Sequence, residues 1–102
     1  RSNLRWCSDI FAIQCWNGDR VTVAFAQDCH DREIISWIAS SKGIDGAMIR
    51  DLMTESLESR FGKASKVPHA LQWLSDNGPQ YIARETIHFG RLLGLEICTT
   101  AP

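Results

Sequence analysis

The most constraining feature of the sequence is a short apolar run that ends abruptly in a carboxylate. Residues 70–74 are apolar except for Gln72, and Ser75-Asp76-Asn77-Gly78-Pro79 follows directly. Such a run is typical of a buried strand that stops at the edge of a sheet, because Asn-Gly and proline favour a turn. We therefore expect Asp76 at the carboxyl end of a strand, where its side chain is presented above the sheet edge.

A second carboxylate, Asp9, lies within another strand-like run. Residues 4–15 are rich in β-branched and aromatic side chains and contain neither proline nor glycine, which predicts a first strand. A carboxylate buried among apolar residues is costly when it has no partner. Asp9 could be a structural aspartate and Asp76 the first residue of a turn, but our interpretation is that the two face each other and hold a divalent metal ion.

The rest of the chain divides into strands and helices by the period of its apolar residues. Apolar residues that alternate along the chain predict strands. After Asp45, a candidate N-cap, apolar residues instead recur at three- and four-residue steps, which predicts a helix that ends at Gly62. The remaining elements follow in the order strand, strand, helix, strand, helix, strand, at residues 20–27, 33–40, 46–62, 70–75, 83–93 and 95–100.

This order predicts an α/β domain with a mixed five-stranded sheet. Three consecutive strands joined by short connections form an antiparallel meander, and the following βαβαβ pattern adds strands through helical, right-handed crossovers. The chain of 102 residues suits one core and one domain, 1–102. With carboxylates on the first and fourth strands, the arrangement resembles the ribonuclease H-like fold, in which those two strands are neighbours.

Three motifs in sequence order resemble the catalytic core of bacterial insertion-sequence transposases, which are related to retroviral integrases. The first is Trp6-Cys7-Ser8-Asp9, and the second is the segment from Asp28 to Trp37 with its aspartates, basic residue and tryptophan. The third and most specific is Asp76-Asn77-Gly78 followed by Tyr81. Together they cover essentially the whole chain, which is therefore expected to be part of an integrase or transposase catalytic core.

The resemblance implies a DDE active site, an Asp-Asp-Glu triad that holds two Mg²⁺ or Mn²⁺ ions for DNA strand cleavage and strand transfer. In it Asp9 bridges the metals and Asp76 binds one of them. The family glutamate lies on a later helix, and neither Glu85 nor Glu96 stands at its place, so we expect that helix and glutamate to lie beyond Pro102. The 102-residue segment is then expected to be inactive alone, with a weak or empty second metal site.

The balance of charge bears on how such a chain would meet DNA. The net charge is −1, which excludes binding through bulk positive charge. The densest basic cluster is Arg60, Lys63 and Lys66, which is either a solvated helix end that complements the helix dipole or a phosphate contact. We take these three residues, together with Asn77, as candidate nucleic-acid contacts.

Several further expectations concern burial and redox state. The four cysteines form no C-x-x-C pair, which argues against a zinc ribbon or a thioredoxin-type motif, and we expect reduced thiols in a cytosolic protein. The resemblance to bacterial transposases implies a bacterial cytoplasmic, nucleoid-associated location. Asp28 and Asp31 are expected to be solvated in a connection between strands. Trp6, Trp37 and Trp73 are expected in or beside the core and Trp16 in solvent. No apolar run approaches the length of a membrane span.

Two other classes of function compete with the transposase reading. The chain could be a non-catalytic DNA-binding or self-association module of a decayed transposase, which need not bind metal. A ribonuclease H-type nuclease would need an acidic residue near the start of the first helix, whereas Glu55 and Glu58 come later. Because a sheet without its last helix has an uncovered flank, we expect a homodimer or a larger assembly.

Overall fold

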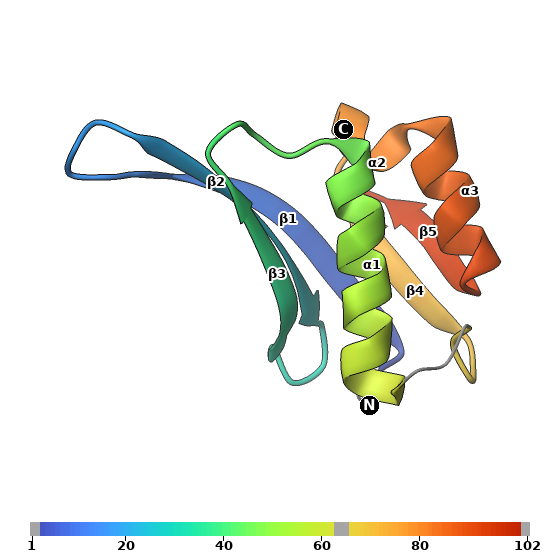
Figure 1. The fold of residues 1–102 in the computed structure, drawn as a ribbon. Coiled ribbons are helices and arrows are strands. Elements are labelled where there is room, and N and C mark those ends of the chain that lie inside the picture. The colour runs from blue at the N-terminus through green and yellow to red at the C-terminus, as the bar shows by residue number, and fades with distance from the viewer. Residues whose placement is uncertain (1–2, 63–65, 101–102) are drawn as a thin grey trace.

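The computed structural model describes residues 3–62 and 66–100, which form one mixed sheet with helices on one side (Figure 1). The strand order is β3-β2-β1-β4-β5. β1 pairs antiparallel with β2 and parallel with β4, β2 pairs antiparallel with β3, and β4 pairs parallel with β5. The predicted α/β sheet and the neighbouring first and fourth strands are confirmed. The strands are β1 (Arg5–Gln14), β2 (Arg20–Asp28), β3 (Ile34–Ser40), β4 (Leu71–Ser75) and β5 (Leu95–Thr99).

Three helices complete the described part of the chain: α1 (Gly46–Phe61), α2 (Pro79–Ile82) and α3 (Arg84–Leu92). The Asp45 side chain caps α1 by accepting a hydrogen bond from the Met48 amide at 2.9 Å, and Gly62 ends it with a φ of 72°. Both caps were predicted, whereas the single turn of α2 was not. None of these helices, within the described residues, is long and apolar enough to cross a lipid bilayer.

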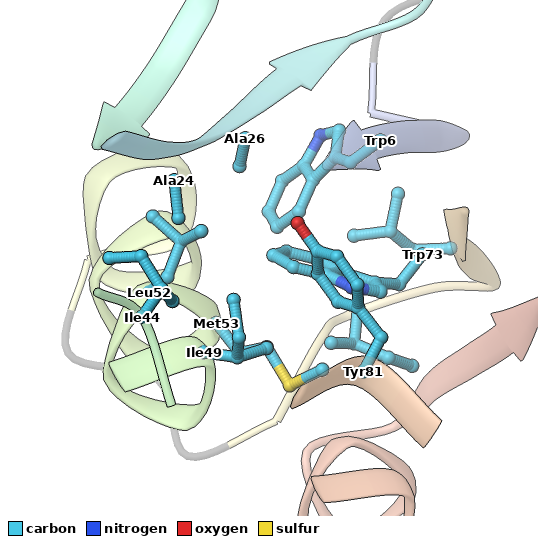
Figure 2. Close-up of a cluster of buried hydrophobic side chains, with 11 residues drawn as sticks. Trp6, Ala24, Ala26, Ile44, Ile49, Leu52, Met53, Trp73 and Tyr81 are labelled. Carbon is cyan, nitrogen blue, oxygen red and sulfur yellow. The ribbon is translucent and has the colours of Figure 1, made fainter. Parts of the chain in front are cut away.

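The core lies between the sheet and helices α1 and α3 (Figure 2). Alternate residues of β1, β2 and β4 point into it, and the Trp6 ring stacks on Phe61 with ring centres 5.9 Å apart. At Gly90 a Cβ would lie 2.6 Å from Ile97 Cδ1 and 3.4 Å from Met53 Cε, so this glycine lets α3 approach both β5 and α1. The buried strand residues on this face are Trp6, Ser8, Ala24, Ala26, Asp28, Leu71, Trp73, Ser75 and Leu95.

No helix of the described ranges covers the other side of the sheet, which we call the open face. An apolar patch on this face is lined by Phe11, Ile13, Val23, Phe25, Ile34 and Trp37. Trp37 is 62% exposed, so the expectation that it lies in or beside the core was wrong. Its strand alternates as predicted, but its side chain falls on the uncovered side. The other three tryptophans are as expected, with Trp16 fully exposed at the end of the β1–β2 hairpin.

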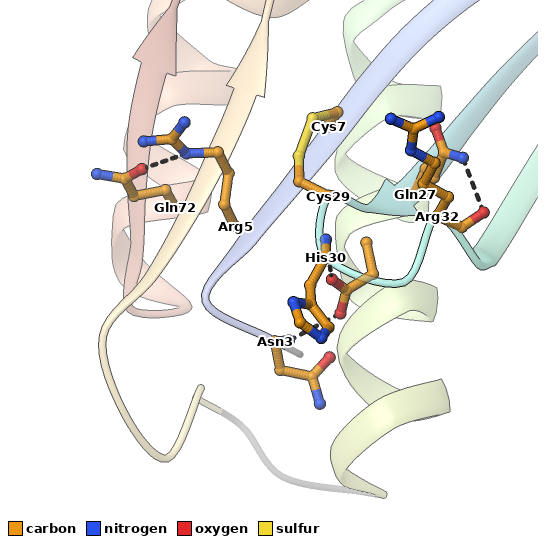
Figure 3. Close-up of a disulfide and its surroundings, with 9 residues drawn as sticks. Asn3, Arg5, Cys7, Gln27, Cys29, His30, Arg32 and Gln72 are labelled. Atoms are coloured by element: carbon orange, nitrogen blue, oxygen red, sulfur yellow. Dashed lines mark hydrogen bonds between the residues drawn. A yellow bond between two sulfur atoms is a disulfide. The ribbon is translucent and has the colours of Figure 1, made fainter. Parts of the chain in front are cut away.

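A disulfide joins Cys7 of β1 to Cys29 directly after β2 (Figure 3). The prediction that all four cysteines are reduced was wrong for this pair, while Cys15 and Cys98 are free. The two residues are brought together because the antiparallel pairing extends to the end of β2, where the Cys29 amide donates to the Arg5 carbonyl at 2.9 Å. The resulting Cα–Cα distance of 6.2 Å is within the range for a disulfide.

Asp28 is fully buried, so the expectation that it is solvated was wrong. Its carboxylate accepts hydrogen bonds from the backbone amides of Asn3 at 2.7 Å and His30 at 2.9 Å. It therefore ties the segment before β1 to the turn after β2, and this role explains why a charged residue is retained inside.

We predict that Asp28→Ala lowers the free energy of unfolding by about 2 kcal/mol, because two backbone amides lose a charged acceptor. Chemical denaturation measures the difference. Asp51→Ala, which removes an exposed carboxylate from α1, is the control and should change the stability by less than about 0.5 kcal/mol. Equal effects of the two substitutions would contradict the role given to Asp28.

Candidate metal centre

Asp76 follows the last residue of β4 and begins a tight turn. Its Oδ1 accepts a hydrogen bond from the Gly78 amide at 2.9 Å, and the Gly78 carbonyl accepts the amide of Tyr81 at 2.9 Å to start α2. The side chain of Asn77 donates to the Thr100 carbonyl at 3.1 Å, which ties the same turn to the end of β5. The carboxylate is thus held at the edge of the sheet and is exposed to solvent, as the sequence predicted.

Asp9 lies in β1 opposite Phe25 of β2. Because side chains alternate along a strand, Asp9 shares the open face with Cys7 and Phe11, while Trp6 and Ser8 point into the core. The carboxylate is exposed, and its Oδ1 accepts the Ile10 amide at 2.8 Å. The cost of a buried charge, which first drew attention to Asp9, therefore does not arise.

The pairing of β1 with β4 brings the two carboxylates together. Cys7 is the register partner of Leu74, and two further residues along each parallel strand lead to Asp9 and Asp76. Both carboxylates line one cavity of about 360 Å³ on the open face. The other residues that line it are Cys7, Ser8, Phe25, Gln27, Leu74, Ser75 and Thr100.

Two hydroxyl groups beneath this cavity connect the elements that carry the carboxylates. Ser8 Oγ and Tyr81 Oη are 2.9 Å apart, and both residues are buried. Burial raises the pKa of the Tyr81 phenol well above its usual value, and the charges of Asp9 and Asp76 add to this rise. Both carboxylates therefore act electrostatically on the same phenol.

Neither Ser8 nor Tyr81 was assigned a role from the sequence. Tyr81 was noted only as part of the motif after Asp76. The available signal was the position of Ser8, since a hydroxyl at a core-facing position of a strand needs a hydrogen-bond partner.

The donor atoms at this site fit a hard divalent cation such as Mg²⁺ or Mn²⁺, which binds carboxylate oxygens and keeps several waters. Each carboxylate uses Oδ1 to accept a backbone amide, and neither Oδ2 makes a hydrogen bond within the described part of the chain. Residues 3–62 and 66–100 contain no group of three or more acidic, histidine or cysteine side chains placed to hold a metal. Within the described residues, the candidate metal ligands of this cavity are therefore the two carboxylates of Asp9 and Asp76.

The candidate phosphate contacts are not all near this pair. Asn77 is adjacent to Asp76, and Lys66 is exposed in the loop that precedes β4. Arg60 lies at the opposite end of α1 from α2, where its guanidinium is 3.9 Å from Asp31 and 3.7 Å from Glu33 (Figure 1). Asp31 is exposed to solvent, as expected, and also forms an ion pair with Arg60. Lys63 lies outside the described residues.

Comparisons with known proteins find relatives over almost the whole chain. A family model described as "Integrase core domain" matches residues 1–102. The chain is 50% identical over 101 residues to an uncharacterized protein of insertion element IS136 from Agrobacterium fabrum, covering 98% of this chain and 51% of the relative. It is 46% identical over 101 residues to the transposase InsD of insertion element IS2 from Escherichia coli, covering 98% of this chain and 33% of the relative. The chain thus spans about half or less of the length of these relatives.

Solved structures show the same fold at low identity. The Mos1 transposase catalytic domain with raltegravir and Mg superposes with a TM-score of 0.76 at 18% identity, over 93% of this chain and 49% of that one. The HTLV-2 integrase catalytic core domain in complex with magnesium gives 0.74 at 16% identity, over 95% of this chain and 60% of that one. The fold is the ribonuclease H-like core of integrases and transposases. Because the family model matches this chain over residues 1–102, the chain belongs to the integrase core domain family.

Proposed function

We propose that this chain carries two metal-binding carboxylates, Asp9 and Asp76, of a transposase catalytic core. The complete enzyme, a polynucleotidyl transferase, would cleave DNA strands and join transposon ends to target DNA. The main support for the proposal is the pairing register of β1 with β4, which brings both carboxylates into the lining of one cavity. Bacterial transposases among the relatives support the same activity, and we extend the proposal to a location in the bacterial cytoplasm, at the nucleoid.

The chemistry follows from what the residues can hold. A bound divalent metal would activate an attacking oxygen and neutralise the charge on the leaving oxygen of a phosphodiester. Asp9 and Asp76 would bind it through the carboxylate oxygens that the backbone amides leave unused. Only two candidate ligands, Asp9 and Asp76, lie in the described residues. We therefore propose that this chain holds one metal ion weakly and that a second metal site needs a further ligand. These residues alone would not carry out strand transfer.

Contacts with DNA form a separate part of the proposal. Asn77 is beside the carboxylates, and Lys66 is exposed, so both can meet phosphate groups. Arg60 would have to leave Asp31 and Glu33 to do the same, which makes it the weakest of the candidates.

We predict that Mn²⁺ binds the chain and that Asp9→Asn and Asp76→Asn each weaken binding by more than about tenfold, because each removes a charged ligand. Isothermal titration calorimetry measures the affinity. Asp51→Asn, which changes an exposed carboxylate outside the cavity, should bind Mn²⁺ as the unchanged chain does. Absence of binding, or equal binding by all variants, would favour a non-catalytic module of a decayed transposase.

We also propose that the chain self-associates through the apolar patch of the open face. Four large side chains there, Phe11, Ile13, Ile34 and Trp37, are 46–62% exposed, and contiguous exposed apolar surface of this kind marks interfaces. A second copy of the chain is the proposed occupant because the patch can pair with itself about a two-fold axis. The HTLV-2 integrase core, which shares the fold, is described in a dimeric form.

We expect Trp37→Ser to raise the dimer dissociation constant by about tenfold or more, because the substitution removes a large aromatic side chain from the interface. Sedimentation equilibrium gives the constant. Trp16→Ser is the matched control: it removes an equally large tryptophan that is fully exposed but lies at the hairpin tip, outside the patch. A monomeric mass at high concentration for the unchanged chain would refute the proposed interface.

A further inference from the structure

Two buried hydroxyl groups bridge β1 and α2 under the metal-site cavity. Ser8 is 5% exposed and Tyr81 is 3% exposed, and their oxygens are 2.9 Å apart. Ser8 Oγ also lies 2.8 Å from the carbonyl oxygen of Phe25. Ser8 immediately precedes Asp9, and Phe25 is the residue of β2 that pairs with Asp9. The hydroxyl pair is therefore anchored on the strand segment that carries the first carboxylate.

The chemistry of these groups fixes the direction of the hydrogen bonds. A carbonyl oxygen can only accept, so the single hydroxyl proton of Ser8 is donated to Phe25. The bond between Ser8 and Tyr81 must then use the phenol proton, and Tyr81 donates to Ser8 Oγ. The result is a directed chain from Tyr81 through Ser8 to the backbone of β2, in which each group makes a specific hydrogen bond.

The other end of this chain leads to Asp76. The Tyr81 amide donates to the Gly78 carbonyl, and the Gly78 amide donates to Asp76 Oδ1, both at 2.9 Å. Tyr81 thus belongs to the same hydrogen-bonded turn as the second carboxylate. The turn is also tied to β5 through Asn77 and Thr100, but those bonds do not reach β1.

A connection of this kind is needed because the backbone pairing ends before the carboxylates. The last paired residues of β1 and β4 are Cys7 and Leu74, two positions short of Asp9 and Asp76. From there the spacing of the carboxylates depends on contacts other than the β1–β4 ladder. The bond between Tyr81 and Ser8 joins the two separate segments at that level.

We propose that Tyr81 is a positioning residue whose hydrogen bond to Ser8 sets the spacing of Asp9 and Asp76 and so the affinity of the metal site. This inference rests on the proposed function, since it takes the two carboxylates to be metal ligands. Partners that orient metal ligands change metal affinity by about 10- to 100-fold when removed.

The test compares Tyr81→Phe, which keeps the ring and removes the hydroxyl, with the double variant Ser8→Ala/Tyr81→Phe. Mn²⁺ affinity is measured by calorimetry, and hydrogen exchange of the Gly78 amide reports the Asp76 turn without metal. Tyr81→Phe should weaken Mn²⁺ binding by about tenfold and speed Gly78 exchange. The double variant replaces both partners by apolar groups, so the thermal midpoint should stay near that of Tyr81→Phe while the affinity remains low.

Ser56→Ala is the matched control. It removes another buried hydroxyl, whose Oγ donates to the Leu52 carbonyl at 2.7 Å inside α1, away from the cavity. This variant should leave Mn²⁺ affinity and Gly78 exchange unchanged, whatever it does to the thermal midpoint.

The outcomes separate this inference from the proposed function. Mn²⁺ binding that is lost in Asp9→Asn but unchanged in Tyr81→Phe would overturn the positioning role and leave the metal site intact. Affinity regained in the double variant would show that packing alone sets the spacing, which also overturns it. No Mn²⁺ binding by the unchanged chain would overturn the proposed metal site and, with it, the claim that Tyr81 tunes affinity.

Discussion

The parallel pairing of β1 with β4 is the interaction on which the rest of the structure depends. It joins segments far apart in the sequence, and its register is fixed by two tryptophans, Trp6 and Trp73, which are partners in the ladder and are both buried. A slip of one residue would turn one of these rings out of the core, because successive side chains of a strand point to opposite faces. The same slip would move one carboxylate to the helix-covered side. Core packing therefore specifies the register that places Asp9 beside Asp76.

The sheet divides the molecule into a side that packs against the helices and a side that carries the proposed metal site. On one side α1 and α3 cover the tryptophans and the small residues of β2. On the open face the carboxylate pair lies between the disulfide at Cys7 and the apolar patch, and Phe25 lines both the metal-site cavity and the patch. A binding event on the patch would therefore occur next to the proposed metal site. The proposed catalytic and assembly surfaces are neighbours on one face.

Much of this arrangement could be predicted from local patterns in the sequence. The two-residue alternation and the helical period located the five strands, α1 and α3, and the cap residues Asp45 and Gly62 marked the ends of α1. The carboxylate after β4 was recognisable because turn residues follow it at once. The resemblance to the ribonuclease H-like fold supplied the neighbouring first and fourth strands, since periodicity alone does not say which strands become neighbours.

The errors arose where a side chain's environment is set by distant residues. Alternation shows which residues of one strand share a face, but it does not show which face the helices cover. Asp28 looked like a solvated loop residue because one of its backbone partners, Asn3, lies 25 positions away and meets it only in the folded sheet. The Ser8–Tyr81 bond depends on the same long-range pairing.

The most direct test of the account is the location of bound Mn²⁺ by paramagnetic line broadening in the NMR spectrum of the chain. Broadening falls steeply with distance from the ion, so it identifies the residues around it without any substitution. The account predicts that the amide signals of residues 8–10 and 76–78 broaden first and at the lowest Mn²⁺ concentration. First broadening elsewhere, for instance at the groove formed by Arg5, His30, Gln72 and Glu96, would contradict the assignment of Asp9 and Asp76 as the metal site.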